Sequence, residues 1–121
     1  MDTLLCKLAR YYASLSYDDV PAEVIETAKR SLADFLSELA AGFYVGELAE
    51  AVNPYLVELG GKPESTLLCV GRKIPAQNAA LGMGVMAHAI ELDDGHRWGT
   101  SHPAVAIMPA VLAMAEREKS S

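Results

Sequence analysis

Side chains that could do chemistry gather in residues 91–102, which read ELDDGHRWGTSH and are followed by Pro103. This segment holds carboxylates, two imidazoles, a guanidinium group and hydroxyls between two apolar stretches. Ionisable groups crowded into a segment without an apolar period are typical of places where protons move or anions bind. We therefore expect any catalytic or binding site of this chain to lie here.

The residue types fit the removal of a proton from a carbon next to a carboxylate. That reaction needs a base, an acid and groups that hold the developing negative charge. Asp94 can act as acid or base if a neighbouring carboxylate raises its pKa. His102 is its natural partner, because imidazole titrates near neutral pH and Pro103 would fix its direction at a helix start. Arg97 can hold a substrate carboxylate, and Thr100 can donate a hydrogen bond.

Structural roles are the alternative for several of these side chains. Acidic residues before a helix often cap it, so Asp93 and Asp94 each keep a capping role open beside a chemical one. Trp98 is interpreted as a packing anchor rather than a substrate platform. His88, on the apolar stretch before the segment, is interpreted as a core or interface histidine. For His102 we favour function, because a histidine before proline at a helix start has no obvious structural duty.

A metal site is a further alternative. His88 and Glu91 are three residues apart, on one face of a helix, and Asp94, His96 and His102 could complete a ligand set. However, the sequence has no HExxH or comparable ligand spacing. We therefore predict no metal site and no cofactor.

The elements around this segment are predicted from apolar residues at helical spacing. One short apolar piece with β-branched residues, 65–70, predicts an extended segment that either pairs with a strand from elsewhere or serves as a connector. The predicted fold is all-α, a single domain over residues 1–121 that forms a bundle of about five helices with one short extended segment. The predicted helices cover residues 4–15, 21–43, 47–59, 75–90 and 104–116.

Glycine and proline refine this prediction. Gly42 and Gly46 are predicted to end the second helix, and Pro54 to bend or restart the third. Gly82 and Gly84 lie inside the fourth helix, where glycine costs roughly 1 kcal/mol relative to alanine. Such a cost is tolerated where another helix must approach closely, so we expect the fourth helix to be central.

Composition excludes several classes of partner. Sixteen acidic against ten basic residues give a net charge of −6, without a basic cluster, which argues against binding to nucleic acid or to an anionic membrane. Cys6 and Cys69 lie in apolar contexts without metal-type spacing, so we expect buried free thiols of a reducing compartment. The sequence has no apolar run of membrane-spanning length and no basic start of a signal peptide. We expect a cytoplasmic protein.

At this level of detail a family resemblance becomes visible. The string PAQNAALGMGVMAHAIELDDGHRWGTSHPAVAIMPAVLAMAE resembles the N-terminal helical region of the MmgE/PrpD family. The strings LARYYASLSYDDVPAEVIETAKRSLADFLSELAAG and GGKPESTLLCVGRKIPAQNAA resemble the opening helices of that family and its connector. Members include 2-methylcitrate dehydratase, cis-aconitate decarboxylase and iminodisuccinate epimerase. The resemblance implies a lyase, or alternatively an isomerase, acting on small di- and tricarboxylates.

The resemblance also implies site residues. The family's pattern is an acidic residue, an apolar residue and Asp-Asp, with His-Pro further on; here Glu91 begins ELDD and His102 begins HP. In the decarboxylase the first acidic residue and this histidine belong to the active site. Two departures are Glu91 in place of aspartate and Gly95 in place of the threonine after Asp-Asp. The predicted site comprises catalytic Glu91, Asp94 and His102, with Arg97 and Thr100 binding the substrate.

The chain is short for the family that it resembles. Family enzymes are several times longer, and a lid domain, lysines and another histidine from later in their chains complete the site. The resemblance therefore implies the N-terminal part of the helical domain without the lid, inactive alone unless a second chain supplies the missing half. Apolar helix faces that a chain of this size cannot cover predict a homo-oligomer, most simply a dimer. The alternative function is a non-catalytic helical self-association module.

Overall fold

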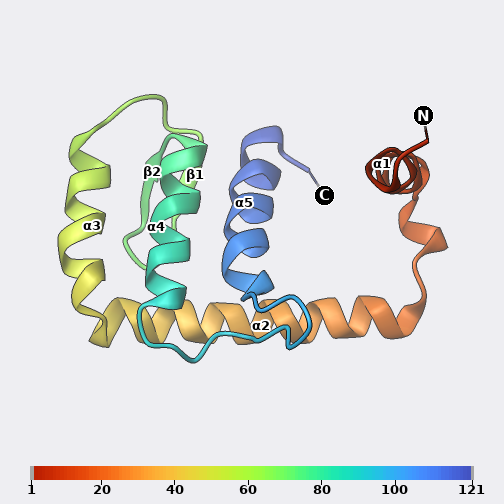
Figure 1. The fold of residues 1–121 in the computed structure, drawn as a ribbon. Helices are drawn as coiled ribbons and strands as arrows, with labels where there is room; N and C mark the ends of the chain where they lie inside the picture. Colours follow the sequence, from red (N-terminus) through yellow and green to blue (C-terminus); the bar gives the residue numbers. More distant parts are fainter. Residues whose placement is uncertain (1, 121) are drawn as a thin grey trace. The chain divides into compact units, whose positions relative to one another are not determined.

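The computed structural model describes residues 2–120. Most of this part of the chain is helical, so the prediction of an all-α fold with a short extended segment is confirmed. The helices are α1 (Leu4–Ser14), α2 (Ala22–Val45), α3 (Glu47–Glu58), α4 (Ala76–His88) and α5 (Pro103–Glu118), with a 3-10 turn η1 (Tyr17–Asp19) and strands β1 (Ser65–Leu67) and β2 (Arg72–Ile74) (Figure 1).

The chain divides into two compact units, with the boundary inside α2 after Arg30. The first unit contains α1, η1 and the first turns of α2. Helix α1 begins where the Thr3 hydroxyl accepts a hydrogen bond from the Cys6 backbone N–H, at 3.3 Å, as an N-cap residue does. None of its residues is buried, although one side of the helix is apolar.

The second unit begins at Ser31 and contains the core. Helices α3, α4 and α5 stand side by side, and residues 31–45 of α2 run across one end of them (Figure 1). Helix α4 contacts both α3 and α5, so the prediction of a central fourth helix is confirmed. Fully buried large apolar side chains of this core, each worth about 1.5–3 kcal/mol on burial, are Phe35, Leu39, Leu56, Leu67, Met83 and Met86.

Glycines permit the close contacts of α4. A Cβ on Gly82 would lie 2.5 Å from Leu67 Cδ1, and one on Gly84 would lie 3.2 Å from the carbonyl oxygen of Val105. The expected close approach at both positions is therefore confirmed. A Cβ on Gly42 would lie only 1.8 Å from the carbonyl oxygen of Met86, so α2 and α4 meet backbone to backbone.

Two predictions about helix ends are wrong in part. Helix α2 runs through Gly42 to Val45, because Gly42 serves the contact with α4 rather than a stop. Gly46 directly follows the end of α2, as predicted, and is also the N-cap of α3. Helix α3 is unbroken across Pro54, so it does not restart there. Since Pro54 and Glu50 are exposed, the Glu50 carbonyl that loses its helical partner is free to bond water.

The extended segment is one strand of a hairpin, so of the two alternatives, a paired strand and a connector, the structure shows the paired strand. Strand β1 pairs antiparallel with β2, with Ser65 opposite Ile74 and Leu67 opposite Arg72. The partner was missed because it begins with two charged residues and carries little apolar signal. Both cysteines are free, as expected, but neither is buried: Cys6 lies on α1, and Cys69 lies in the hairpin turn. In residues 2–120, no helix has the length and apolar character needed to cross a membrane.

Candidate active site

The predicted site segment is the connection between α4 and α5. Helix α4 ends at His88, and Glu91 turns the chain out of the helix with a left-handed backbone, φ +54°. Further on, the His96 N–H donates to the Ser101 carbonyl at 2.8 Å, and this bridge closes residues 97–100 into a tip. The connection therefore has two parts, a turn beside α4 and a closed tip before α5.

A buried carboxylate joins the two helices. The Asp93 side chain is fully buried, and its Oδ2 lies 2.8 Å from His88 Nδ1 and 3.3 Å from His102 Nδ1. The two imidazole rings are 5.4 Å apart between centroids. His88 is half exposed and bonded to Asp93, so its interpretation as a core histidine is wrong. Sequence reasoning missed this pair because a separation of five residues does not share a helix face; the turn at Glu91 brings the two together.

The backbone fixes the proton position on His102. Its Nδ1 lies 2.8 Å from the Asp94 carbonyl oxygen. A carbonyl oxygen only accepts hydrogen bonds, so Nδ1 carries the hydrogen and the neutral ring keeps its lone pair on Nε2. No described residue bonds to that Nε2, and the side chain is 45% exposed. His102 is therefore arranged to accept a proton at Nε2 and return it.

Asp94 has a structural role through its side chain. Its Oδ1 accepts a hydrogen bond from the Ala104 N–H, in the first turn of α5, at 2.9 Å. This N–H is one of the four that a helix leaves without a partner at its start. The capping alternative for Asp94 thus has a specific contact, whereas its catalytic role stays a prediction.

The predicted site residues line two different hollows. Glu91 is exposed, with Oε1 3.7 Å from His88 Nε2, and these two residues border an otherwise mostly apolar hollow of about 490 Å³. Arg97, Thr100 and His102 border a second hollow, of about 400 Å³, beside the loop tip. The structure therefore brings three of the five predicted residues together, with Asp94 bonded to His102 through its carbonyl, and leaves Glu91 on the other hollow.

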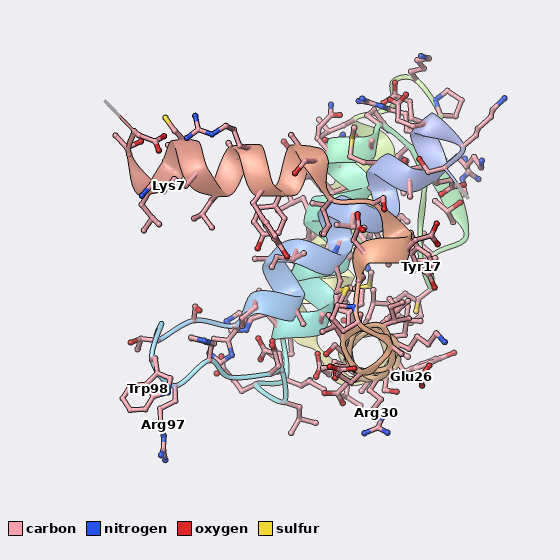
Figure 2. All side chains as sticks on the ribbon, turned by 90° about the vertical axis from the view of Figure 1, so that its right-hand side faces the viewer. Lys7, Tyr17, Glu26, Arg30, Arg97 and Trp98 are labelled. Atoms are coloured by element: carbon pink, nitrogen blue, oxygen red, sulfur yellow. The ribbon has the colours of Figure 1, made fainter. Side chains whose placement is uncertain are left out.

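The loop tip points its largest side chains outward. Figure 2 shows Arg97 and Trp98 directed away from the helices, and Trp98 is 89% exposed. Its interpretation as a packing anchor is wrong, because the tip closes on its own backbone through His96 and never reaches the core. Thr100 has φ +48°, an outlier for a β-branched residue that is typical of turns and functional sites.

A buried acid on α2 belongs to the electrostatics of this site. Glu38 is 5% exposed, and no described group bonds to either of its carboxyl oxygens. Burial, followed by the negative charges of Asp34, Asp93 and Asp94, raises the pKa of Glu38 above its ordinary value. The sequence could have indicated this buried acid, because Glu38 occupies a position on the apolar face of α2, where a charged side chain is rarely found.

The pKa of His88, on α4, is also shifted by carboxylates, and Asp93 is common to both sets. The hydrogen bond to Asp93, then its charge and more weakly that of Glu91, raise the pKa of His88. This shift favours the imidazolium form beside Asp93.

Across the described part of the chain, no three histidine, cysteine or acidic side chains are grouped so that they could hold a metal ion.

With this geometry in place, comparison with known proteins decides the family. The sequence profile of the MmgE/PrpD N-terminal domain matches residues 6–121. The chain belongs to the MmgE/PrpD family. It is 31% identical over 115 residues to the cis-aconitate decarboxylase-like protein oryM of Aspergillus oryzae, an alignment that covers 91% of this chain and 23% of the relative.

A second relative agrees. Cis-aconitate decarboxylase of Aspergillus terreus is 27% identical over 113 residues, covering 91% of this chain and 22% of the relative. The chain thus spans less than a quarter of the length of these MmgE/PrpD relatives. No solved structure matches this sequence.

Proposed function

We propose that this chain is the N-terminal helical part of a lyase that acts on small di- or tricarboxylates by proton transfer next to a carboxylate. The observation that carries the proposal is His102, whose Nδ1 is held by the Asp94 carbonyl while its half-exposed ring borders the same hollow as Arg97. Membership of the MmgE/PrpD family supports it, as do two relatives whose names specify decarboxylation of a tricarboxylate, cis-aconitate.

The chemistry follows from the side chains around the loop tip. Nε2 of His102 takes the proton from the carbon acid or gives one to the leaving group. The Arg97 guanidinium has no ion-pair partner in residues 2–120 and can bind a substrate carboxylate with two parallel hydrogen bonds. Thr100 offers a hydroxyl in the same hollow. Glu91 and Asp94 complete the proposed catalytic set, with Asp94 acting on His102 through its carbonyl.

Charge explains why we propose that the chain is inactive alone. The described surroundings of His102 contain the acids Asp93 and Asp94, against the Arg97 guanidinium and the His88 imidazole, which is bonded to Asp93. A substrate with two or three carboxylates needs further cations, and loss of one charge-stabilising donor can cost about a hundredfold in rate. We propose that the remainder of a longer protein, or a second chain, supplies these groups.

Binding can be tested on the chain as it stands. We would titrate labelled protein with cis-aconitate, or with acetate as a monocarboxylate control, and follow the side-chain NMR signals of His102 and Arg97. Cis-aconitate is expected to shift both signals at millimolar concentration, with no turnover of cis-aconitate or 2-methylcitrate. Arg97→Gln should abolish the shift of the His102 signal caused by cis-aconitate. The matched control Arg72→Gln, on the exposed hairpin, should leave that shift unchanged.

Three outcomes would each contradict a part of this proposal. Cis-aconitate that shifts neither signal would remove the substrate class. Binding that survives in Arg97→Gln would remove the role of Arg97. Turnover by the isolated chain that disappears in His102→Ala would show instead that no second half is needed.

A second candidate, self-association as a homodimer, is favoured by an exposed apolar stripe on α5. Ile107, Val111 and Met114 follow at spacings of four and three residues, and each is more than 40% exposed. Sedimentation of the wild type is expected to give a dimer at micromolar concentration, and Ile107→Glu a monomer. The control Leu59→Glu replaces an equally exposed leucine beyond the end of α3 and should remain dimeric. A wild type that sediments as a monomer would refute this candidate.

A further inference from the structure

We propose that the buried carboxyl groups of Asp93 and Glu38 act as one positioning unit for His102, in which Asp93 is ionised and Glu38 carries a proton. The purpose assigned to His102 rests on the proposed function, but the arrangement itself can be tested without substrate. Asp93 and Glu38 touch no substrate in this proposal; they act through the imidazole.

The Asp93 carboxylate has one imidazole donor on Oδ2 and a second imidazole close to the same oxygen. Nδ1 of His102 carries a hydrogen because it faces the Asp94 carbonyl, and it lies 3.3 Å from Asp93 Oδ2. His88 Nδ1 approaches the same Oδ2 to 2.8 Å. A fully buried carboxylate is stable as an anion only where such donors compensate its lost hydration. Ionised Asp93 therefore fits its surroundings on the side of Oδ2.

The other oxygen of Asp93 lacks a donor. Asp93 Oδ1 is buried and has no hydrogen-bond partner in residues 2–120, and both oxygens of Glu38 are in the same condition. Buried polar atoms without partners are rare in native proteins, so orphaned acceptors on two neighbouring acids require a common explanation. A proton on Glu38 provides one, since the acid O–H can donate to Asp93 Oδ1 directly or through one water.

The charges around Glu38 favour its protonated form. The groups that face it are acids, Asp34 on its own helix and Asp93 and Asp94 on the loop, and each opposes a further negative charge. The imidazoles of the cluster, His88 and His102, lie against Asp93 instead. When two carboxyl groups share a buried site, one of them keeps its proton. No described hydrogen-bond donor faces Glu38, so Glu38 is the carboxyl group that keeps its proton.

The consequence for His102 is a fixed tautomer and a stabilised cation. The Asp94 carbonyl holds Nδ1–H, with the Asp93 anion 3.3 Å from the same nitrogen, which leaves Nε2 as the basic nitrogen. When Nε2 takes a proton from a substrate carbon, the ring becomes an imidazolium, and the Asp93 charge stabilises it without accepting a proton. Neutral Glu38 keeps the cluster from gaining a second buried negative charge, while Glu91 lies outside, exposed beside His88.

NMR of the whole chain can test this arrangement. The pH titrations and ring-nitrogen shifts of His88 and His102 would be recorded in the wild type and in Asp93→Asn, Glu38→Gln and Asp34→Asn. Asp93→Asn should return the pKa of His88 to about its ordinary 6.5 and populate both tautomers of His102. Glu38→Gln, which mimics a protonated Glu38, should leave the titration of His88 within about 0.2 of the wild type. Asp34→Asn removes one of the charges that oppose ionisation of Glu38, so it should lower the pKa of Glu38 toward its ordinary value.

The opposite results are equally clear. If Glu38 were ionised, Glu38→Gln would remove a negative charge and lower the pKa of His88, and the proposal would be wrong. Should Asp93→Asn fail to fold, the carboxyl carbon signal of Glu38 in the wild type decides: it should titrate above 4.5, and titration at or below that value overturns the proposal. Loss of cis-aconitate binding with these signals intact would reject the proposed function alone.

Discussion

Glu116, near the end of α5, fastens the hairpin to the helices. Its Oε2 accepts from the Thr66 backbone N–H at 2.6 Å, and its Oε1 lies 2.8 Å from both the Thr66 hydroxyl and Lys73 Nζ. The hydrogen bond from Lys73, followed by that from the Thr66 backbone, lowers the pKa of Glu116 from 4.5 to about 2. We predict that Glu116→Gln, which keeps the shape but removes the charge, lowers the free energy of unfolding.

The size of the effect follows from the pKa shift. One pKa unit corresponds to about 1.4 kcal/mol, so a carboxylate lowered this far contributes at most about 3.5 kcal/mol at neutral pH. The Glu116 side chain is 34% exposed and that of Lys73 is 56% exposed. Solvent screening reduces the expected loss to about 1–2 kcal/mol. Because the folded pKa is lowered, this stability is present above pH 4.5 and is lost as the pH falls through about 2.

Urea unfolding followed by far-UV circular dichroism would measure the loss at neutral pH and at acidic pH values down to about 2. The difference between wild type and Glu116→Gln should shrink to a few tenths of a kcal/mol at the acidic end. The matched control is Glu118→Gln, two residues on, whose side chain is 59% exposed and pairs with the neighbouring Arg117; we expect a loss below about 0.5 kcal/mol. An equal loss for Glu116→Gln at both ends would refute the electrostatic reasoning and indicate packing instead. No loss at neutral pH would mean that solvent screens the pair completely.

Three further predictions concern the helices that carry the site. Gly42→Ala should lower the free energy of unfolding by about 3 kcal/mol or more, because its Cβ would meet a backbone oxygen of α4 at 1.8 Å. The control Gly95→Ala, with open space around the added Cβ, should leave the free energy of unfolding nearly unchanged. Equal losses for the two variants in urea unfolding would contradict the close contact at Gly42. Asp94→Ala should cost about 1 kcal/mol through the lost bond to Ala104, with faster amide exchange in the first turn of α5, and unchanged exchange would disprove the cap. Because burial raises the pKa of Glu38, the folded state binds an extra proton, so the free energy of unfolding of the wild type should fall as the pH rises above 4.5. Glu38→Gln should remove that fall. If the variant and the wild type show the same dependence of stability on pH, Glu38 is not the source of the fall.

The helices could be predicted because apolar spacing is a local property. The stripes along α1, α2, α4 and α5 recur every three or four residues, and the predicted ends lie close to the observed ones. Wrong predictions arose where a residue has both a local and a tertiary use. Gly42 looks like a helix stop, but it is required where α4 crosses. Strand β2 has little apolar character of its own and exists because β1 and α5 bind it through Lys73 and its backbone.

The sequence alone determined where the site lies and the family, since residues 91–102 are polar, lack an apolar period and carry the ELDD and HP motifs. It could not determine which of these side chains meet. His88, Asp93, His102 and Glu38 come from α4, the loop, the start of α5 and α2. Their hydrogen bonds, burial and charge effects depend on how these four elements pack, and packing distances are not encoded in spacing along the chain. Only the tertiary structure therefore decides that the Asp93 carboxylate lies between two imidazoles and that a second acid is buried beside it.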